Sequence, residues 1–393
     1  MPADTATPRG SPLGEGARLL ETDAEVEELA VHLAGEPLIA LDTEADSFHS
    51  YFTKVCLIQI STRTTDVIID PLAVGSLAPL GPVFADPRIA VVLHGADYDV
   101  RILDRDHALH VRGLFDTMIA ARFLGNKAFG LSNLVEQYFE VRLPKEHQRA
   151  DWSRRPLSAA LLRYAANDTH HLPALHDRLR EDLAARGRLT WAEEEFGLLE
   201  QVRHQVREDD REPFLRIKGA KDLDRRGLAV LRAAAELRDA MARELDRAPF
   251  RVLGNETLIE IAKQRPRRPR DLASLRGLPR GRKRSFDTEL LGAVATALDL
   301  PEADLPQFPR RTSRGRPEPE PNLTPLKKAR DLIAAQLDLE PAFLAPNALL
   351  EAAARQRPAD EKAFLTLPGA RRWQAALLSA PLSSVLAASG GKG

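Results

Sequence analysis

The segment that most constrains this chain is residues 38–44, in which an apolar run, Leu-Ile-Ala-Leu, ends abruptly in Asp-Thr-Glu. A short apolar run indicates a buried strand, although its pattern alone is also compatible with a helix. Because residues two apart on a strand share a face, we expect Asp42 and Glu44 to lie side by side. Such carboxylates repel each other unless a cation lies between them. The alternative is a strand that runs out into a solvated acidic turn.

The composition is that of a globular protein with more than one domain. With 393 residues, 44% of them hydrophobic and 29% charged, the chain is expected to form about two or three domains. Its single cysteine, Cys56, excludes an internal disulfide and a cysteine-based zinc site. The first residues, rich in Pro, Gly, Ala and Thr, are typical of a disordered tail and not of a signal peptide. No run approaches the about 18 apolar residues of a membrane helix, so we expect a cytoplasmic protein with no membrane segment.

Further apolar segments predict the rest of a sheet. Strand-like runs occur at 55–61 and 66–70, which are joined at hairpin distance, and at 89–93 and 114–116. The short connection favours an antiparallel start to the sheet. After residue 88, strands alternate with helical segments, a pattern typical of an α/β domain with a mixed sheet.

Two more acidic positions follow in the same region. Asp99 comes in the first turn of the helix expected after His94, where it either adds a third metal carboxylate or simply complements the helix dipole. Tyr164 and Asp168 are four residues apart and therefore share one helix face. The alternative for this last pair is a hydrogen-bonded Tyr–Asp contact on a helix surface.

In combination these residues resemble the DEDD superfamily of 3′→5′ exonucleases, in the subgroup that uses a tyrosine. Residues 42–44 match its first motif, residues 94–99 its second and residues 164–168 its third, in the right order and spacing. The resemblance implies a ribonuclease H-like α/β fold with a mixed five-stranded sheet. It also implies a catalytic set, namely Asp42, Glu44, Asp99, Tyr164 and Asp168.

The chemistry of the four carboxylates suits that activity. Phosphodiester hydrolysis is helped by two cations about 4 Å apart that neutralise the attacking and leaving oxygens. Carboxylate oxygens favour two divalent ions such as Mg²⁺ or Mn²⁺ over zinc. By resemblance, Asp42 bridges both ions, Glu44 and Asp168 bind one, and Asp99 completes the site. A tyrosine with a pKa of about 10 is a poor general base, so Tyr164 is expected to orient the attacking water.

A second set of residues resembles the ribonuclease D branch of that superfamily. Asp151-Trp152 and Arg155-Pro156-Leu157 carry the resemblance, with Lys145 and Gln148 as candidate contacts to the substrate backbone. These two side chains are equally compatible with a solvated loop. The resemblance implies an exoribonuclease that acts on single-stranded 3′ ends of RNA, transfer RNA precursors among them, and it indicates no obligatory protein partner.

The C-terminal half of the chain contains a duplication. The pattern Asn-x-x-Leu…Gln-Arg-Pro runs from Asn255 to Pro266 and returns from Asn347 to Pro358, 92 residues later. One such repeat predicts two helical domains and not a solenoid. The sequence Pro-Phe-x-Val-Leu at 249–253, before a leucine-rich helix, resembles the HRDC family of small nucleic-acid-binding domains.

Positive charge is concentrated in the first copy. Between Lys263 and Arg284 there are ten Lys and Arg residues against one acid, Asp271. This density suits phosphate attraction without base stacking, although a solvated surface is the alternative. The candidate RNA contacts are Arg267, Arg268, Arg282, Lys283 and Arg284. The second copy is degenerate and less basic, so we expect it to serve in packing.

The sequence thus predicts a linear domain plan. It consists of a tail (1–17), an exonuclease domain (18–190), a helical connector (191–217), a first HRDC domain (218–303), a Pro/Arg/Glu-rich linker (304–321) and a second, HRDC-like domain (322–388). Two other functions stay open at this point. One is a DNA 3′→5′ exonuclease. The other is a non-catalytic RNA-binding protein whose nuclease domain has decayed, which predicts the loss of at least one metal ligand, and none is lost here.

Overall fold

The computed structural model describes residues 17–144, 147, 150–205, 212–278, 284–308 and 322–390. Within these, the chain forms two compact units. The sheet unit contains the described residues of 17–45, 55–204 and 322–390, and the helical unit contains those of 46–54, 205 and 212–308.

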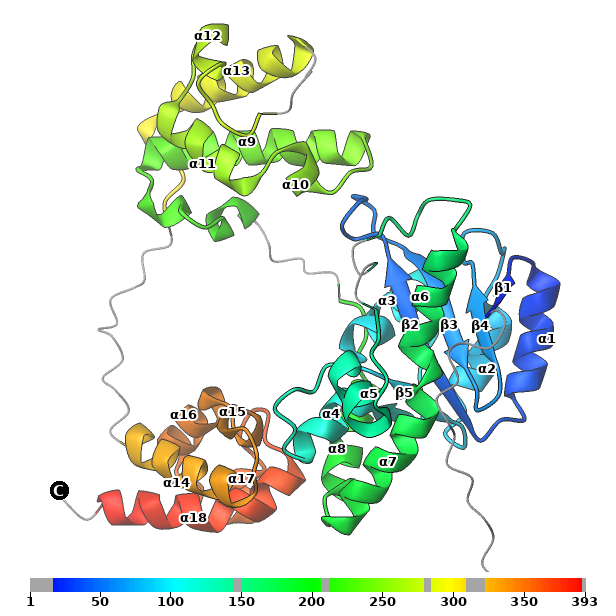
Figure 1. Ribbon diagram of the computed structural model, residues 1–393. Helices are drawn as coiled ribbons and strands as arrows, with labels where there is room; N and C mark the ends of the chain where they lie inside the picture. Colours follow the sequence, from blue (N-terminus) through cyan, green and yellow to red (C-terminus); the bar gives the residue numbers. More distant parts are fainter. Residues whose placement is uncertain are drawn as a thin grey trace, which may run out of the picture. The chain divides into compact units, whose positions relative to one another are not determined.

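The sheet unit is built on a mixed sheet in the order β1-β4-β3-β2-β5-β6 (Figure 1). The β2–β3 and β3–β4 pairs are antiparallel, as the hairpin spacing predicts, and the other pairs are parallel. The strands are β1 (Arg18–Leu20), β2 (Leu38–Ala45), β3 (Val55–Ser61), β4 (Asp66–Ile69), β5 (Ala90–Leu93) and β6 (Leu114–Asp116). The predicted α/β class with a mixed sheet is therefore confirmed.

The sheet has six strands where five were expected. The additional strand is β1, which lies at the edge of the sheet and pairs in parallel with β4, with Arg18 beside Val67. A strand of three residues is too short to show an alternating pattern, so the sequence carries no periodic signal for it.

Helices pack on the sheet, and α6 and α7 lie over it in Figure 1. The helices of this part are α1 (Asp23–Leu33), α2 (Gly81–Phe84), α3 (Asp97–His107), α4 (Thr117–Phe123), α5 (Leu131–Phe139), α6 (Ala159–His170), α7 (Leu172–Ala185) and α8 (Leu189–Leu199). The sequence from residue 157 to about 183 has a continuous helical pattern that predicts one long helix, but the structure has two helices that meet at His171. Pro173 causes the break, because it has no N–H to continue the hydrogen bonds of α6.

The helical unit contains the first copy of the repeat, and the second copy belongs to the sheet unit. The first copy comprises α9 (Arg225–Glu244), α10 (Pro249–Val252), α11 (Asn255–Gln264), α12 (Pro269–Leu272) and α13 (Arg284–Leu298). The second comprises α14 (Leu323–Gln336), α15 (Pro341–Leu344), α16 (Asn347–Gln356), α17 (Glu361–Phe364) and α18 (Arg372–Gly390). Short 3-10 turns occupy Ala78–Leu80, Pro213–Arg216, Ala220–Asp222 and Glu302–Asp304.

The two copies repeat each other in detail. Arg265 and Arg357, 92 residues apart, end α11 and α16 in the same left-handed conformation, with φ of 49° and 47°. Arg238 donates to Asn255 Oδ1 at 2.7 Å, and its counterpart Arg330 donates to Asn347 Oδ1 at 3.1 Å. The predicted duplication is therefore confirmed.

The second copy packs against the rest of the sheet unit through four aromatic residues, which we call the seam: Phe123, Trp191, Phe343 and Trp373. Trp373 packs edge-on against Phe123, with ring centroids 5.0 Å apart, and lies parallel to Trp191 at 5.9 Å. Phe343 contacts Phe123 at 4.8 Å. The side chain of Arg188 crosses the seam and donates to the carbonyls of Phe123 and Leu337. The predicted packing role of the second copy is confirmed by this shared core.

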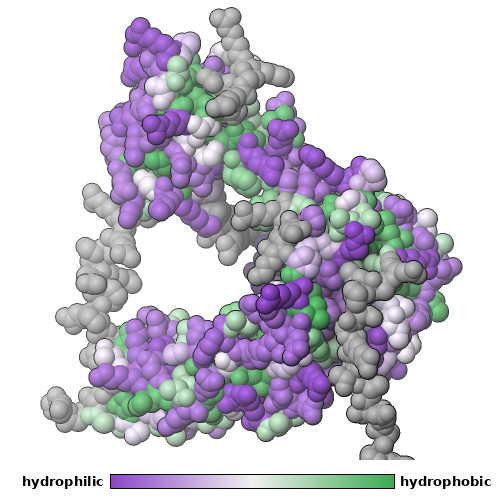
Figure 2. Space-filling view, in the orientation of Figure 1, coloured by the Kyte–Doolittle hydropathy of each residue, from purple (hydrophilic) through white to green (hydrophobic). Residues whose placement is uncertain are grey.

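No helix in the described part of the chain is long and apolar enough to cross a membrane. The face shown in Figure 2 is mostly hydrophilic, with hydrophobic residues in scattered patches.

Candidate active site

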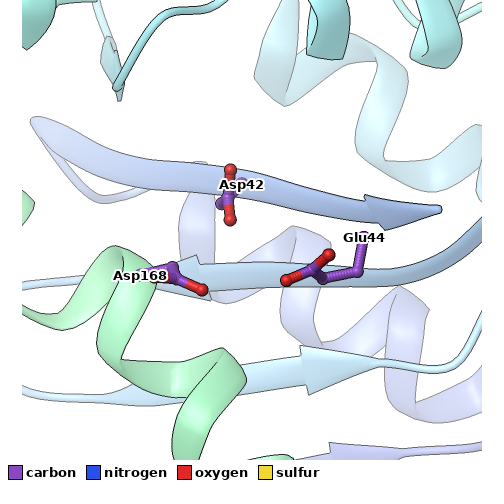
Figure 3. A group of neighbouring side chains, drawn as sticks. All are labelled: Asp42, Glu44 and Asp168. Carbon is purple, nitrogen blue, oxygen red and sulfur yellow. The ribbon is translucent and has the colours of Figure 1, made fainter. Parts of the chain in front are cut away.

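Three of the predicted carboxylates meet at the sheet. Asp42 and Glu44 project from one face of β2, and Asp168 projects from α6, which covers that face. Their ligand oxygens all lie within 4.8 Å of one another. In Figure 3 the carboxylates of Glu44 and Asp168 point toward each other, with Asp42 on the strand beside them. This grouping is what the spacing of the first and third motifs predicts.

The positions of these acids follow from local packing. The apolar half of β2, residues 38–41, is fully buried and fixes the register that places Asp42 opposite Gln59 of β3. On the other side, α6 is tied to the sheet one residue after Asp168, where the hydroxyls of Thr169 and Ser61 are bonded at 2.7 Å. Asp168 is therefore held by its helix against the strand that carries Asp42.

Asp99 is bonded differently from the other three acids. It lies in the first turn of α3, as expected, and it is buried. Its carboxylate accepts a hydrogen bond from the hydroxyl of Thr43, whose side chain lies on the opposite face of β2 from Asp42 and Glu44. The structure therefore places Asp99 next to the group of three without making it part of that group.

The strand–helix junction before Asp99 is fixed by a buried acid, Asp116. Its oxygens accept from the backbone N–H groups of Gly95 and Ala96 and also from two N–H groups in the first turn of α4. His94 Nδ1 lies 2.9 Å from the hydroxyl of Thr117, which itself donates to a carbonyl, so His94 donates. His94 is therefore held in the junction by a hydrogen bond to Thr117.

The acids are crowded where water is largely excluded. Burial, followed by the charges of the other three acids, raises the pKa of Asp42 well above its usual range. Burial also raises the pKa of Glu44 to about 8, of Asp168 to about 7 and of Asp99 to about 6. Near neutral pH, Asp42 and Glu44 therefore hold protons that an ordinary aspartate or glutamate would have lost, and Asp168 holds one part of the time.

This arrangement fits a divalent cation. Negative charges that are brought together under a helix are destabilising by themselves, and a bound cation reverses that effect. The donors are carboxylate oxygens, which suit Mg²⁺ or Mn²⁺, and no His or Cys belongs to the group. The site can therefore hold a hard metal ion between Asp42, Glu44 and Asp168.

Tyr164 lies one helical turn before Asp168 and is buried. Its ring is stacked on Trp152, with centroids 6.2 Å apart, and the segment that contains Trp152 is anchored by Arg155. Arg155 pairs with the buried carboxylate of Asp70. Burial and the nearby acids raise the pKa of Tyr164 further, so the phenol keeps its proton.

The remaining predicted site residues are described only in part. Arg267 and Arg268 are exposed on the first helical copy. Arg284 begins α13, and only its backbone is described. Lys145, Gln148, Arg282 and Lys283 lie outside the described residues. These contacts stay predictions.

The supporting residues of the site were not identified from the sequence. Thr43, Asp116 and the Arg155–Asp70 pair act through contacts between segments distant in the chain, which a local pattern does not reveal. A signal did exist for Asp116, since Asp before Thr at the start of a helix is typical of an N-cap.

Comparison with family models supports the same division of the chain. A 3′-5′ exonuclease model matches residues 17–184. An HRDC domain model matches twice, at residues 227–294 and 322–381. The exonuclease match spans the three acidic motifs, and the two HRDC matches correspond to the two helical copies.

The chain also resembles characterised proteins over most of its length. It is 34% identical over 353 residues to Ribonuclease D of Granulibacter bethesdensis, covering 88% of each chain. Its structure is similar to that of Escherichia coli RNase D, described as an exoribonuclease involved in structured RNA processing, with a TM-score of 0.68, 27% identity and coverage of 95% of this chain and 99% of that one. The catalytic core of RRP6 from Trypanosoma brucei matches with a TM-score of 0.66 and 33% identity, covering 72% and 80%.

Proposed function

This chain belongs to the ribonuclease D family and is a 3′→5′ exoribonuclease, and from this membership we propose how its residues work. We propose that Asp42, Glu44, Asp99 and Asp168 together hold two divalent cations, Mg²⁺ or Mn²⁺. The observation that carries this proposal is the approach of three carboxylates to within 4.8 Å. When bound, such ions neutralise charge on the attacking and leaving oxygens of a phosphodiester.

Each acid has a distinct part in this proposal. By the family resemblance, Asp42 would contribute to both ions, Glu44 and Asp168 would contribute to one, and Asp99 would complete the site. The raised pKa values mean that binding of the ions displaces protons from these carboxyls.

Tyr164 orients the water that attacks the terminal phosphodiester. Because its pKa is raised, the phenol is neutral and donates a hydrogen bond, and it is not a general base. Its stacking on Trp152 keeps the ring in one orientation over the acids.

The first helical copy supplies attraction for the RNA backbone. Arg267 and Arg268 are exposed, and the same segment contains the further cations Arg282, Lys283 and Arg284. Lys145 and Gln148, which lie outside the described residues, contact the substrate backbone. Phosphate contacts of this kind are independent of sequence. We also propose that the domains have the boundaries expected from the sequence.

The natural substrates are single-stranded 3′ ends of structured RNA, with transfer RNA precursors as the best candidates. The E. coli relative is described as acting in structured RNA processing, and this chain aligns with it over 95% of its length. We also propose that the protein is cytoplasmic and that it acts without an obligatory protein partner.

The test compares three substrates. A transfer RNA with a 3′ extension, a single-stranded RNA and a DNA of the same sequence are incubated with Mg²⁺, Mn²⁺ or EDTA. We expect shortening of the extended transfer RNA to its mature end, in either metal and not in EDTA. Preference for DNA would contradict the RNA substrate, and indiscriminate degradation of all three would contradict the processing role.

Metal stoichiometry is the second part of the test. Calorimetric titration with Mn²⁺ is expected to give two ions per chain for the wild type and weak or no binding for Asp42→Asn. A matched control is Asp177→Asn, which changes an exposed acid on α7 that is paired with Arg63. One ion per chain would contradict the two-metal site.

A further inference from the structure

Gln59 is a buried polar side chain that has no hydrogen-bond partner among the described residues. It lies in the middle of β3 and is fully buried. Among the described residues, neither its Nε2 nor its Oε1 has a hydrogen-bond partner. A buried amide that makes no hydrogen bond costs stability, because it has lost its hydration and gained nothing in return. An apolar side chain of the same size would serve the fold better at this position.

The sheet register places Gln59 beside the acidic group. It is directly opposite Asp42 on β2, with Ile68 of β4 on its other side. Residues directly opposite on antiparallel strands point to the same face, with Cβ atoms about 5 Å apart. Two residues further along β3, on the same face, Ser61 is bonded to Thr169 of α6. Gln59 therefore lies under the helix that carries Asp168.

The other neighbours on this face are apolar. Leu57, Ile68 and Ala165 are fully buried members of one hydrophobic cluster, and their side chains offer no hydrogen-bonding group. Ser61 and Thr169, the hydroxyl residues on this face, are bonded to each other, and the carboxylate directly across from Gln59 in the register is that of Asp42. A carboxamide can donate to a carboxylate without adding charge to it.

We propose that Gln59 is a positioning residue, whose Nε2 donates a hydrogen bond to the carboxylate of Asp42 when that carboxylate holds divalent cations. The inference rests on the proposed metal site and adds a residue to it. Carboxylates that bind metals are commonly held by such a hydrogen bond, and removal of the donor lowers metal affinity about 10- to 100-fold.

The test uses Gln59→Met, which keeps the length of the side chain and removes both polar atoms. Metal-free protein with this substitution is expected to melt at the wild-type temperature or above it, because an unpaired buried amide is gone. Its affinity for Mn²⁺, measured by calorimetric titration, is expected to fall about 10- to 100-fold. Higher stability combined with weaker metal binding is a result that a purely structural glutamine would not give.

A matched control applies the same substitution to a glutamine that has partners. Gln374 is buried in α18, where its Nε2 donates to the carbonyl of Leu344 and its Oε1 accepts from the N–H of Arg371, both at 3.0 Å. Gln374→Met leaves these two groups unpaired. We expect it to lower the melting temperature and to leave the affinity for Mn²⁺ unchanged.

The outcomes separate this inference from the metal site on which it rests. If wild type binds Mn²⁺, Asp42→Asn does not, and Gln59→Met binds as wild type does, the role of Gln59 is wrong and the metal site stands. If wild type itself binds no Mn²⁺, the metal site fails and the inference fails with it. Gln59→Glu, which cannot donate when ionised, is also expected to weaken binding. Tighter binding by this variant would make residue 59 a direct ligand and overturn the donor role.

Discussion

In the first helical copy, α9 to α13 pack around a core of their own, whereas the corresponding helices of the second copy share one core with the sheet. The difference lies in a few side chains on a common scaffold. Phe343, which is part of the seam, has Arg251 as its counterpart in the first copy. Arg267 and Arg268 of the first copy have Ala359 and Asp360 as counterparts in the second.

This comparison shows how one duplicated fold can acquire two uses. Aromatic side chains on the second copy bury it against the exonuclease domain, and no substrate can then reach that surface. Arginine side chains on the first copy keep its surface charged and accessible. The scaffold itself, including the Arg238–Asn255 and Arg330–Asn347 contacts, has changed little.

The largest effect on stability is expected from a substitution that disrupts the seam. Trp373 is almost fully buried against three aromatic rings, so Trp373→Ala should lower the free energy of unfolding of the sheet unit by about 3–5 kcal/mol. Phe286→Ala, in the core of the first copy, should destabilise the helical unit and leave the transition of the sheet unit in place. Calorimetric melts of both variants check this. A lowered sheet-unit transition in Phe286→Ala would contradict the separation of the two cores.

A smaller effect tests the scaffold that the copies share. Arg330→Met removes hydrogen bonds to the Ala345 carbonyl and to Asn347, which leaves the buried Ala345 carbonyl unpaired, at a cost of about 1–3 kcal/mol. Arg238→Met should cost about the same in the helical unit. Urea unfolding of each variant measures the two costs. A large cost in one copy and none in the other would show that the repeat is conserved in shape but not in energetics.

Opposite effects of charge removal should distinguish the active site from the first copy. Asp168, with a pKa raised to about 7, opposes folding when charged, and this opposition disappears as the pH falls toward its unfolded value of about 3.9. In metal-free protein, Asp168→Asn should therefore raise the melting temperature by a few degrees at pH 8 and by much less at pH 5.

The counterpart is Asp224, which caps α9 through the N–H of Gly227 and pairs with Arg265. These hydrogen bonds lower its pKa, so its charge stabilises the folded state above its unfolded pKa and Asp224→Asn should lower the melting temperature at pH 8. Thermal melts at the two pH values measure both variants. A lower melting temperature for both variants at pH 8 would contradict the conclusion that the charge of Asp168 opposes folding.

The smallest effect concerns RNA binding. Arg267→Ala and Arg268→Ala should each weaken binding of single-stranded RNA a few-fold, and each should reduce the slope of the salt dependence by about one ion, because one phosphate is no longer neutralised. Ala359→Arg, at the counterpart of Arg267, should change neither quantity. Fluorescence anisotropy at several salt concentrations gives both numbers. A gain in binding from Ala359→Arg would show that the second copy also meets RNA.

Much of the fold and of the site could be predicted because their signals are local. The apolar run before Asp42, the acid in the first turn after His94 and the Tyr164–Asp168 spacing each depend on a few adjacent residues. The 92-residue repeat was visible for the same reason. Local signals have a limit, since β1 was too short to show a period and Pro173 divided a helical pattern that looked continuous.

The rest depends on contacts between distant segments. Nothing near Trp373 in the sequence indicates that it meets Phe123, and nothing near Thr43 indicates that it bonds Asp99. Gln59 belongs to the same class, because its burial is predictable from the apolar strand but its lack of a partner among the described residues is visible only in three dimensions.

The central claim is that the acids around Asp42 catalyse removal of nucleotides from RNA 3′ ends. The most direct measurement follows a 5′-labelled single-stranded RNA with time in Mg²⁺, for wild type, Asp42→Asn and the control Asp177→Asn. We predict a ladder that shortens one nucleotide at a time from the 3′ end in wild type and control, and no shortening in Asp42→Asn. Unchanged degradation by Asp42→Asn would contradict the claim, as would internal cleavage.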